Sequence, residues 1–253
     1  MPPITYCNES MMAYRSARRI FQPGEHVVFD DAYRLAHLPL VNAGHPAAIT
    51  ELDGRDYQNG TYEKARYALV MPISAEVFQQ SDQFQALERE MKSSAFSSKI
   101  AWGLCETRRS RLHATLASGL LDADLDRWTI RVQEVLDRIG PISICLKGPF
   151  AGNRNTGRVY LPVYPQKIGG ADSLALVQQA IGAPQTGLYL VGYYHFLEEL
   201  DSSETAELAH LIDRWCDRVV AHMSITYLEL HATNDDLALS ARSYAKILTR
   251  REG

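Results

Sequence analysis

The stretch RRSRLHATLASGL, residues 108–120, has the pattern of one β-strand with two chemically different faces. Side chains alternate along a strand, so His113 and Thr115 lie on one face, about 7 Å apart, together with Arg111. The opposite face is apolar and consists of Leu112, Ala114 and Leu116. An imidazole can move a proton and a hydroxyl can donate a hydrogen bond, so the His/Thr face is suited to hold a phosphate group.

Helical and strand patterns alternate on both sides of this stretch. A strand pattern over 62–74 and a helical pattern over 75–96 precede it. The segments that follow are a helix over 123–140, a hairpin over 141–165, a helix over 171–182, a strand over 186–200, a helix over 202–220 and a strand over 222–234. The tail from 237 fits either a strand or a helix. The order strand, helix, strand occurs twice along the chain, and each occurrence is called a round here. Two such rounds predict an α+β fold of two similar lobes, with antiparallel sheets lining a central cleft and helices outside.

Composition limits the class of protein. The chain has 253 residues, 46% hydrophobic and 22% charged, which is typical of a folded domain. Its formal net charge of -4 argues against a non-specific nucleic-acid binder. It has neither a long apolar run nor a signal-peptide pattern, and its four cysteines are dispersed, so we expect a cytoplasmic protein with reduced thiols.

The domain boundary is expected near residue 60. Residues 1–60 are rich in Gly, Pro and Asp and are predicted to form an irregular arm or lid that covers the cleft. Residues 61–253 are predicted to form the two-lobed domain. In the arm, six residues offer an alternative metal cluster, although their spacing matches no common ligand motif. These are Glu25, His26, Asp30, Asp31, His37 and His45.

A second histidine lies in the matching strand of the second round. His195 lies 82 residues after His113, in the stretch LYLVGYYHFLEEL. The order of elements, together with the LHATL motif of residues 112–116, resembles the two-histidine (2H) phosphoesterase superfamily. That superfamily includes RNA 2′,3′-cyclic phosphodiesterases and 2′-5′ RNA ligases. The resemblance covers roughly residues 62–250 and leaves the arm outside.

The resemblance implies metal-independent hydrolysis of a cyclic phosphodiester, with no cofactor. His113 and His195 would be the acid and base, and Thr115 would hold the phosphate. The second motif departs from the family pattern, since Leu197 stands where Thr or Ser is expected. His222 and His231 are alternatives, and residues 230–233 repeat the LHAT of 112–115, but the order of elements favours His195.

Further polar residues on the predicted open faces are candidates for binding phosphate or stacking on a base. They are Arg111, Lys147, Arg158, Tyr160 and Tyr193. We expect a monomer that acts on a small nucleotide or an RNA end, with no DNA or membrane partner. The alternative is a degenerate family member that binds a phosphorylated ligand with little or no turnover.

Overall fold

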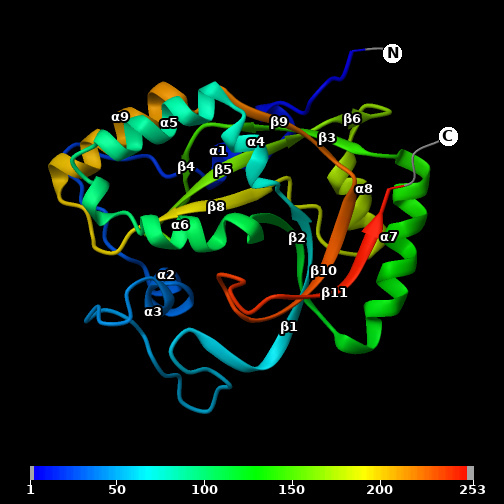
Figure 1. The fold of residues 1–253 in the computed structure, drawn as a ribbon, viewed down its shortest axis with the longest axis horizontal. Coiled ribbons are helices and arrows are strands. Elements are labelled where there is room, and N and C mark those ends of the chain that lie inside the picture. Colours follow the sequence, from blue (N-terminus) through cyan, green and yellow to red (C-terminus); the bar gives the residue numbers. More distant parts are fainter. Residues whose placement is uncertain (1–2, 250–253) are drawn as a thin grey trace.

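The computed structural model describes residues 3–249, which form an α+β fold around a large antiparallel sheet (Figure 1). Within these residues the main sheet has nine strands, in the order β11-β10-β1-β2-β8-β5-β3-β9, with β4 paired to β5. The strands are β1 (Thr61–Pro72), β2 (His113–Leu120), β3 (Ile142–Lys147), β4 (Phe150–Ala151), β5 (Arg158–Pro165), β8 (Leu190–His195), β9 (Val219–Ile225), β10 (Tyr227–Asp235) and β11 (Arg242–Leu248). A separate ribbon pairs β6 (Lys167–Ile168) with β7 (Ala171–Asp172). The expected α+β class is confirmed.

Helices pack on the sheet at two places (Figure 1). α5 (Asp82–Ser93) and α9 (Ser202–Trp215) lie together at one end, with α4 (Ala75–Gln79) and α6 (Trp102–Arg108) nearer the middle. α7 (Leu125–Ile139) and α8 (Ser173–Ala180) pack against each other at the other end. The buried residues of α7 recur at helical spacing and form one apolar stripe. They are Leu125, Trp128, Val132, Val135 and Leu136. No helix among residues 3–249 has the length and apolar character needed to cross a membrane.

The junction between β2 and β8 is the narrowest point of the sheet. These strands share a single residue pair, Ala114 with Val191. Further along β8, the backbone carbonyls on this side accept hydrogen bonds from the segment that contains α6, where a neighbouring strand would otherwise supply the donors. The Ala101 amide donates to the His195 carbonyl at 2.9 Å, and the Arg108 guanidinium donates to the Gly192 carbonyl at 2.7 Å.

The stretch 222–234, expected as one strand, is instead divided between two. β9 ends at Ile225 and β10 begins at Tyr227. β9 pairs with β3 at one edge of the sheet, whereas β10 pairs with β1 near the other. The chain therefore carries His222 and His231 to opposite ends of the sheet. The tail, for which the sequence left two alternatives, forms the edge strand β11.

Residues 3–60 pack closely on the rest of the chain. They contain η1 (Glu9–Met11), α1 (Tyr14–Ala17), α2 (Asp31–Ala36) and α3 (Leu38–Val41). The buried Tyr14 hydroxyl lies within hydrogen-bond distance of the carbonyl oxygens of Val163 and Tyr189, at 2.5 and 2.9 Å. The buried Tyr33 hydroxyl donates to the Phe196 carbonyl at 2.7 Å. These bonds join the arm to β5 and β8.

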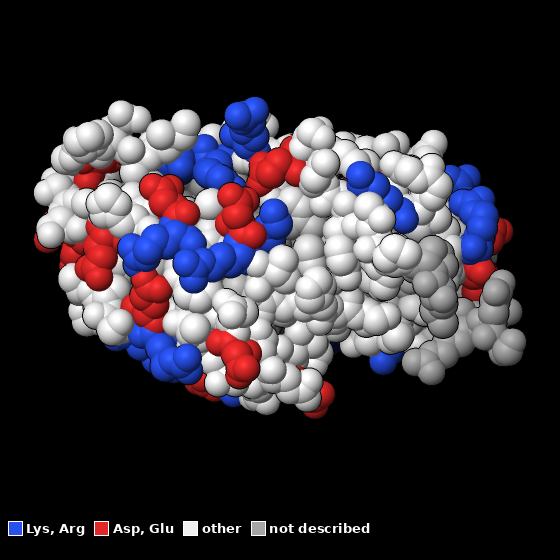
Figure 2. Space-filling model, turned by 90° about the horizontal axis from the view of Figure 1, so that it is seen from above, with Lys and Arg blue, Asp and Glu red and all other residues white. Residues whose placement is uncertain are grey.

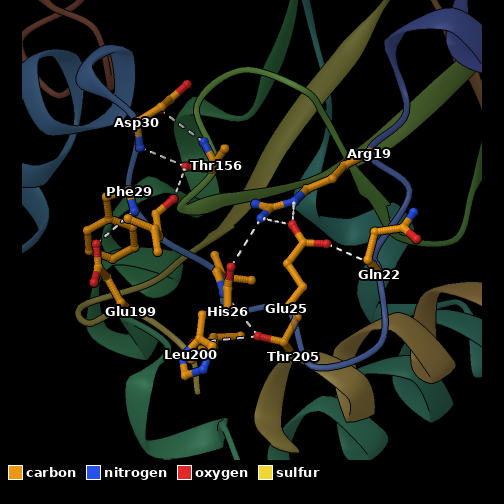
Figure 3. Close-up of polar contacts among 12 residues, drawn as sticks. Arg19, Gln22, Glu25, His26, Phe29, Asp30, Thr156, Glu199, Leu200 and Thr205 are labelled. Atoms are coloured by element: carbon orange, nitrogen blue, oxygen red, sulfur yellow. Dashed lines mark hydrogen bonds and ion pairs between the residues drawn. The ribbon is translucent and has the colours of Figure 1, made fainter. Parts of the chain in front are cut away.

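Polar contacts fix the middle of the arm as well (Figure 3). Asp30 caps α2 through the Tyr33 amide and also accepts bonds from the amides of Asn155 and Thr156. Val27 pairs with Leu200 as an isolated bridge. The backbone of the arm is irregular, but its polar groups find partners in the loop before β5 and in the segment before α9.

Replacing Tyr14 by Phe tests whether the arm is an integral part of the fold. The change removes a hydroxyl that lies within hydrogen-bond distance of two buried carbonyl oxygens and can donate to either. We therefore expect the free energy of unfolding to fall by about 1–3 kcal/mol. Urea denaturation measures the difference. Tyr244→Phe is the matched control because Tyr244 is exposed, and its effect should stay within about 0.5 kcal/mol. Equal stability of the two variants would show that the Tyr14 hydrogen bonds contribute little.

Candidate functional site

Two His-x-Thr motifs flank β1 in the sheet. β2 carries His113 and Thr115, and β10 carries His231 and Thr233. Both strands pair with β1. Their cross-strand partners on β1 are Pro72 for His113, Val70 for Thr115, Ala68 for His231 and Arg66 for Thr233. These partners are spaced by two residues, so they lie on one face of β1, and the two motifs approach each other across that face.

The two motifs line one cavity of about 540 Å³. The rings of His113 and His231 meet edge to face, with centroids 5.4 Å apart. Arg66 and the adjacent Asp235 and Asp236 also line the cavity. All lining residues belong to 65–238, so residues 3–60 do not cover this cavity as the predicted lid would.

The environment of His113 favours a neutral imidazole. Its Nδ1 lies 2.8 Å from the Arg111 carbonyl oxygen, which can only accept, so Nδ1 carries the hydrogen and Nε2 keeps a lone pair. Burial, assisted by the nearby charge of Arg108, lowers the pKa of His113 to about 4. Near neutral pH His113 is therefore a proton acceptor.

His231 has a different partner. Its Nε2 lies 3.2 Å from a carboxylate oxygen of Glu229, the spacing of an ion pair when the imidazole is protonated. Its Nδ1 is buried without a hydrogen-bond partner among the described residues. His231 thus has a carboxylate neighbour, whereas the neighbour of His113 is a backbone carbonyl.

The two threonines are not equivalent. The Thr233 hydroxyl donates to the Asp235 carbonyl at 3.0 Å and so helps to form the turn after β10. Thr115 is exposed at the cavity, and its hydroxyl has no partner within residues 3–249. Thr115 is the hydroxyl that is available to a ligand.

The two aspartates that line the cavity are occupied by other groups. Asp235 accepts from the amides of Leu237, Leu239 and Ser240, so its charge organises the turn. Asp236 accepts from the Tyr62 hydroxyl at 2.8 Å, and desolvation of its carboxyl group raises its pKa. Both arrangements reduce the repulsion that a bound anion would meet.

Two arginines, Arg108 and Arg158, lie near enough to His113 for their charges to lower its pKa. Arg108 is 1% exposed, and its Nη1 and Nε donate to the carbonyls of Gly192 and Leu237, at 2.7 and 3.2 Å. Burial and the nearby Arg158 lower the pKa of Arg108 to about 9, which still leaves it charged at neutral pH. Arg158, from β5, lies within hydrogen-bond distance of His37. Neither guanidinium has an ion pair among residues 3–249.

The structure does not bring His195 into the cavity with His113. His195 is 1% exposed, and neither ring nitrogen has a hydrogen-bond partner within the described chain. Its ring packs edge to face on His37, with centroids 5.8 Å apart. The division of 222–234 into two strands places His231 beside His113 instead, while His222 stays exposed next to Tyr6. The sequence feature that pointed to His231 was the repeated LHAT.

The other predicted binding residues are dispersed. Arg111 donates to the carbonyls of Ala238 and Ala241. Lys147, on β3, lies 3.7 Å from Asp217. Tyr193 lines a separate cavity with Phe78 and Phe84. Tyr160 is buried beneath the Arg158 guanidinium, which lies 5.0 Å from its ring centroid.

The arm residues of the alternative metal cluster do not assemble. Glu25 pairs with Arg19, Asp30 caps α2, and His45 accepts from the Ala47 amide. Within residues 3–249, no group of three or more His, Cys, Asp or Glu side chains is arranged to hold a metal ion.

Comparisons with known proteins found similar solved structures but no match to a family model or to a curated sequence. Among solved structures, TT0787 of Thermus thermophilus is 12% identical with a TM-score of 0.42, over 74% of this chain and 100% of that one. The conserved protein of unknown function ATU0111 from Agrobacterium tumefaciens is also 12% identical with a TM-score of 0.42, over 84% of this chain and 98% of that one.

Acid should destabilise the fold through its buried neutral histidines. Burial lowers the pKa of His37, His113 and His195 below the ordinary 6.5, and that of His113 to about 4. Below pH 6.5 the unfolded chain gains protons that the folded chain does not bind. Stability should therefore fall as the pH drops from about 6.5 towards 4, by up to about 1.4 kcal/mol per pH unit for each histidine.

Urea midpoints measured between pH 7.5 and 4.5 check this expectation. His195→Leu removes one of these groups and should flatten the decline. His210→Gln is the control because His210 is exposed on α9. A decline that is unchanged in His195→Leu would exclude His195 as a source of the acid sensitivity.

Proposed function

We propose that the cavity is the active site of a metal-independent phosphodiesterase that acts on a cyclic phosphodiester of a nucleotide or an RNA end. The observation that carries the proposal is the contact between His113 and His231, each two residues before a threonine, in one cavity. The sequence resemblance to the 2H phosphoesterases supports the same chemistry. The proposed pair differs from the sequence expectation in using His231 in place of His195.

The proposed mechanism follows from the different environments of the two imidazoles. His113 Nε2 removes a proton from a water molecule, whose oxygen attacks phosphorus. The bond from phosphorus to the ribose oxygen breaks, and His231, protonated in this proposal, gives the proton of Nε2 to that leaving oxygen, since its Nδ1 is buried. The product is a phosphomonoester, and exchange with solvent restores both histidines. Thr115 donates a hydrogen bond to a non-bridging phosphate oxygen during the reaction.

The strand order supports a duplicated, two-lobed architecture. The sheet can be divided at the single Ala114–Val191 pair into two halves, β11-β10-β1-β2 and β8-β5-β3-β9, with the short β4 added to the second half beside β5. In this proposal both catalytic histidines come from the first half, since β2 and β10 flank β1. The catalytic pair is then not produced by the duplication itself, which distinguishes this chain from the expectation of one histidine per lobe.

The surface charge supports a small substrate. On the face that Figure 2 shows, basic and acidic side chains of the described residues are interspersed. Arg214 of α9 forms an ion pair with Glu90 of α5, and Lys92 pairs with Glu88 within α5. A long RNA is bound along a continuous basic stripe, so the formal net charge of -4 supports a small nucleotide over a long RNA.

Removing either catalytic histidine should abolish most of the turnover. With EDTA present, we expect hydrolysis of one member of a panel of 2′,3′-cyclic, 3′,5′-cyclic and linear phosphodiesters. His113→Ala and His231→Ala should each lower kcat by about 10²- to 10⁴-fold. His195→Leu and His222→Ala are the controls and should retain activity. Loss of activity in His195→Leu with an intact fold would restore the original pairing, and binding of nucleotide without turnover would favour the degenerate family member.

Replacing Thr115 by Val tests the phosphate-binding role of its hydroxyl. A hydrogen bond to a charged oxygen contributes about 1.5–3 kcal/mol, so kcat/KM should fall by about 10- to 150-fold. Steady-state kinetics on the substrate found above give this ratio. Because Thr115 is exposed and makes no bond in the described chain, the melting temperature should not change. Unchanged kcat/KM would remove Thr115 from the site.

A further inference from the structure

The side chain of Arg158 lies directly on the backbone of Gly192. A Cβ atom at position 192 would overlap the guanidinium of Arg158, so only glycine leaves room for it. The close approach alone accounts for the glycine, because Gly192 is not among the glycines with positive φ. The same guanidinium packs over the Tyr160 ring, at 5.0 Å from its centroid.

Gly192 and His113 lie next to the single residue pair that joins β2 and β8. That pair, Ala114–Val191, is antiparallel, so Gly192 follows Val191 on β8 and His113 precedes Ala114 on β2. Both residues therefore lie on the face of the sheet opposite the Ala114 and Val191 side chains, and the guanidinium on Gly192 is on the same side as the His113 imidazole. Consistent with this placement, the charge of Arg158 contributes to the lowered pKa of His113.

Arg158 is a cation whose hydrogen bonds are incomplete. Its Nη1 lies 3.1 Å from Nε2 of His37, while its Nε is buried without a partner among residues 3–249. The side chain is partly exposed, and no carboxylate of the described chain forms an ion pair with it. Arg108 is a second guanidinium nearby, bonded to two carbonyls and, within residues 3–249, to no carboxylate at ion-pair distance. Asp235 interacts with Arg108 and Asp236 with Arg158 only from beyond that distance, so the two cations favour the binding of an anion on the solvent side of Arg158.

His37 connects this cation to the arm. It follows α2, is 3% exposed, and cannot accept from Arg158 when protonated, since both its nitrogens would then be donors. Burial and the charges of Arg158 and Arg108 lower its pKa well below the ordinary value. A neutral His37 therefore accepts from Nη1 through Nε2 and holds the guanidinium in place.

We infer that Arg158 binds a charged phosphate oxygen of the substrate beside His113, and that His37 of the arm is the positioning residue that orients Arg158. The ligand class is a phosphodiester monoanion or the phosphomonoester that it yields. The catalytic consequence rests on the proposed function, but anion binding does not. The arm then supports the site through Arg158 rather than closing over it.

Binding of inorganic phosphate to the full chain tests the inference independently of catalysis. Titration calorimetry would compare the wild type with Arg158→Met, Arg158→Lys and the control Arg154→Met, which changes an exposed arginine in the loop before β5. We expect Arg158→Met to weaken phosphate binding by about 10- to 150-fold, as for one lost bond to a charged group. Arg158→Lys should also weaken it, because one ammonium group cannot replace the planar fork that meets both His37 and phosphate. Arg154→Met should bind like the wild type.

Two variants of His37 separate positioning from packing. His37→Gln keeps an acceptor and should retain phosphate binding, whereas His37→Phe keeps the ring volume but removes the acceptor and should weaken binding. In turnover assays, His37→Phe should raise KM for the phosphodiester more than it lowers kcat, and His37→Gln should restore KM. Melting temperatures within a few degrees of the wild type ensure that folded proteins are compared.

Each outcome decides one part of the inference. Phosphate affinity and kcat/KM that are unchanged in both Arg158 variants would overturn it, whether or not His37→Phe folds. Equal affinity and KM in His37→Phe and the wild type would remove His37 while leaving Arg158. Phosphate binding that depends on Arg158, without hydrolysis of any diester, would support the anion site and contradict the proposed hydrolysis.

Discussion

The hydrogen bonds of the Arg108 guanidinium fix the parts of the chain that form the cavity. One nitrogen donates to the Gly192 carbonyl on β8 and another to the Leu237 carbonyl in the turn after β10. The halves of the sheet share only the pair Ala114–Val191, so Arg108 adds a link where strand pairing is weakest. A buried cation bonded only to carbonyls is costly. Its hydrogen bonds join three elements at this junction: α6, β8 and the turn after β10.

The two histidines differ in their surroundings. Burial lowers the pKa of His113 and keeps its imidazole neutral, and the charges of Arg108 and Arg158 add to this effect. His231 lies beside the carboxylate of Glu229 instead. The two histidines thus have different neighbours, and the proposed division into acid and base rests on this difference. Arg108 and Arg158 come from α6 and β5, and Glu229 lies on β10 just before the second motif, so neither motif itself contains the difference.

Local patterns in the sequence predicted the helix at α7, the α+β class and the strand at β2, because these depend on side-chain periodicity within one segment. The predicted strand began at Arg108, but β2 begins at His113, since Arg108 ends α6 and Arg109–Arg111 form a 3-10 turn. The division of 222–234 at Thr226 was not predicted. Both halves are rich in strand-forming residues, so nothing local marks the change of partner from β3 to β1. The choice between His195 and His231 depended on that division. The repeated LHAT is a local feature of residues 230–233, whereas the place of His231 beside His113 depends on the pairing of β10 with β1.

The arm also shows that local sequence features do not predict tertiary contacts. Its Gly, Pro and Asp content correctly predicted irregular backbone, but irregular backbone can be packed as firmly as a helix when aromatic side chains anchor it, as Tyr14 and Tyr33 do. His37 reaches Arg158 across 121 positions of sequence, and Arg158 reaches Gly192 across a strand pair. Contacts of this kind exist only after the sheet has formed. The composition of the arm therefore predicts its irregular backbone, whereas the contact of the buried His37 with Arg158 is set by the tertiary fold.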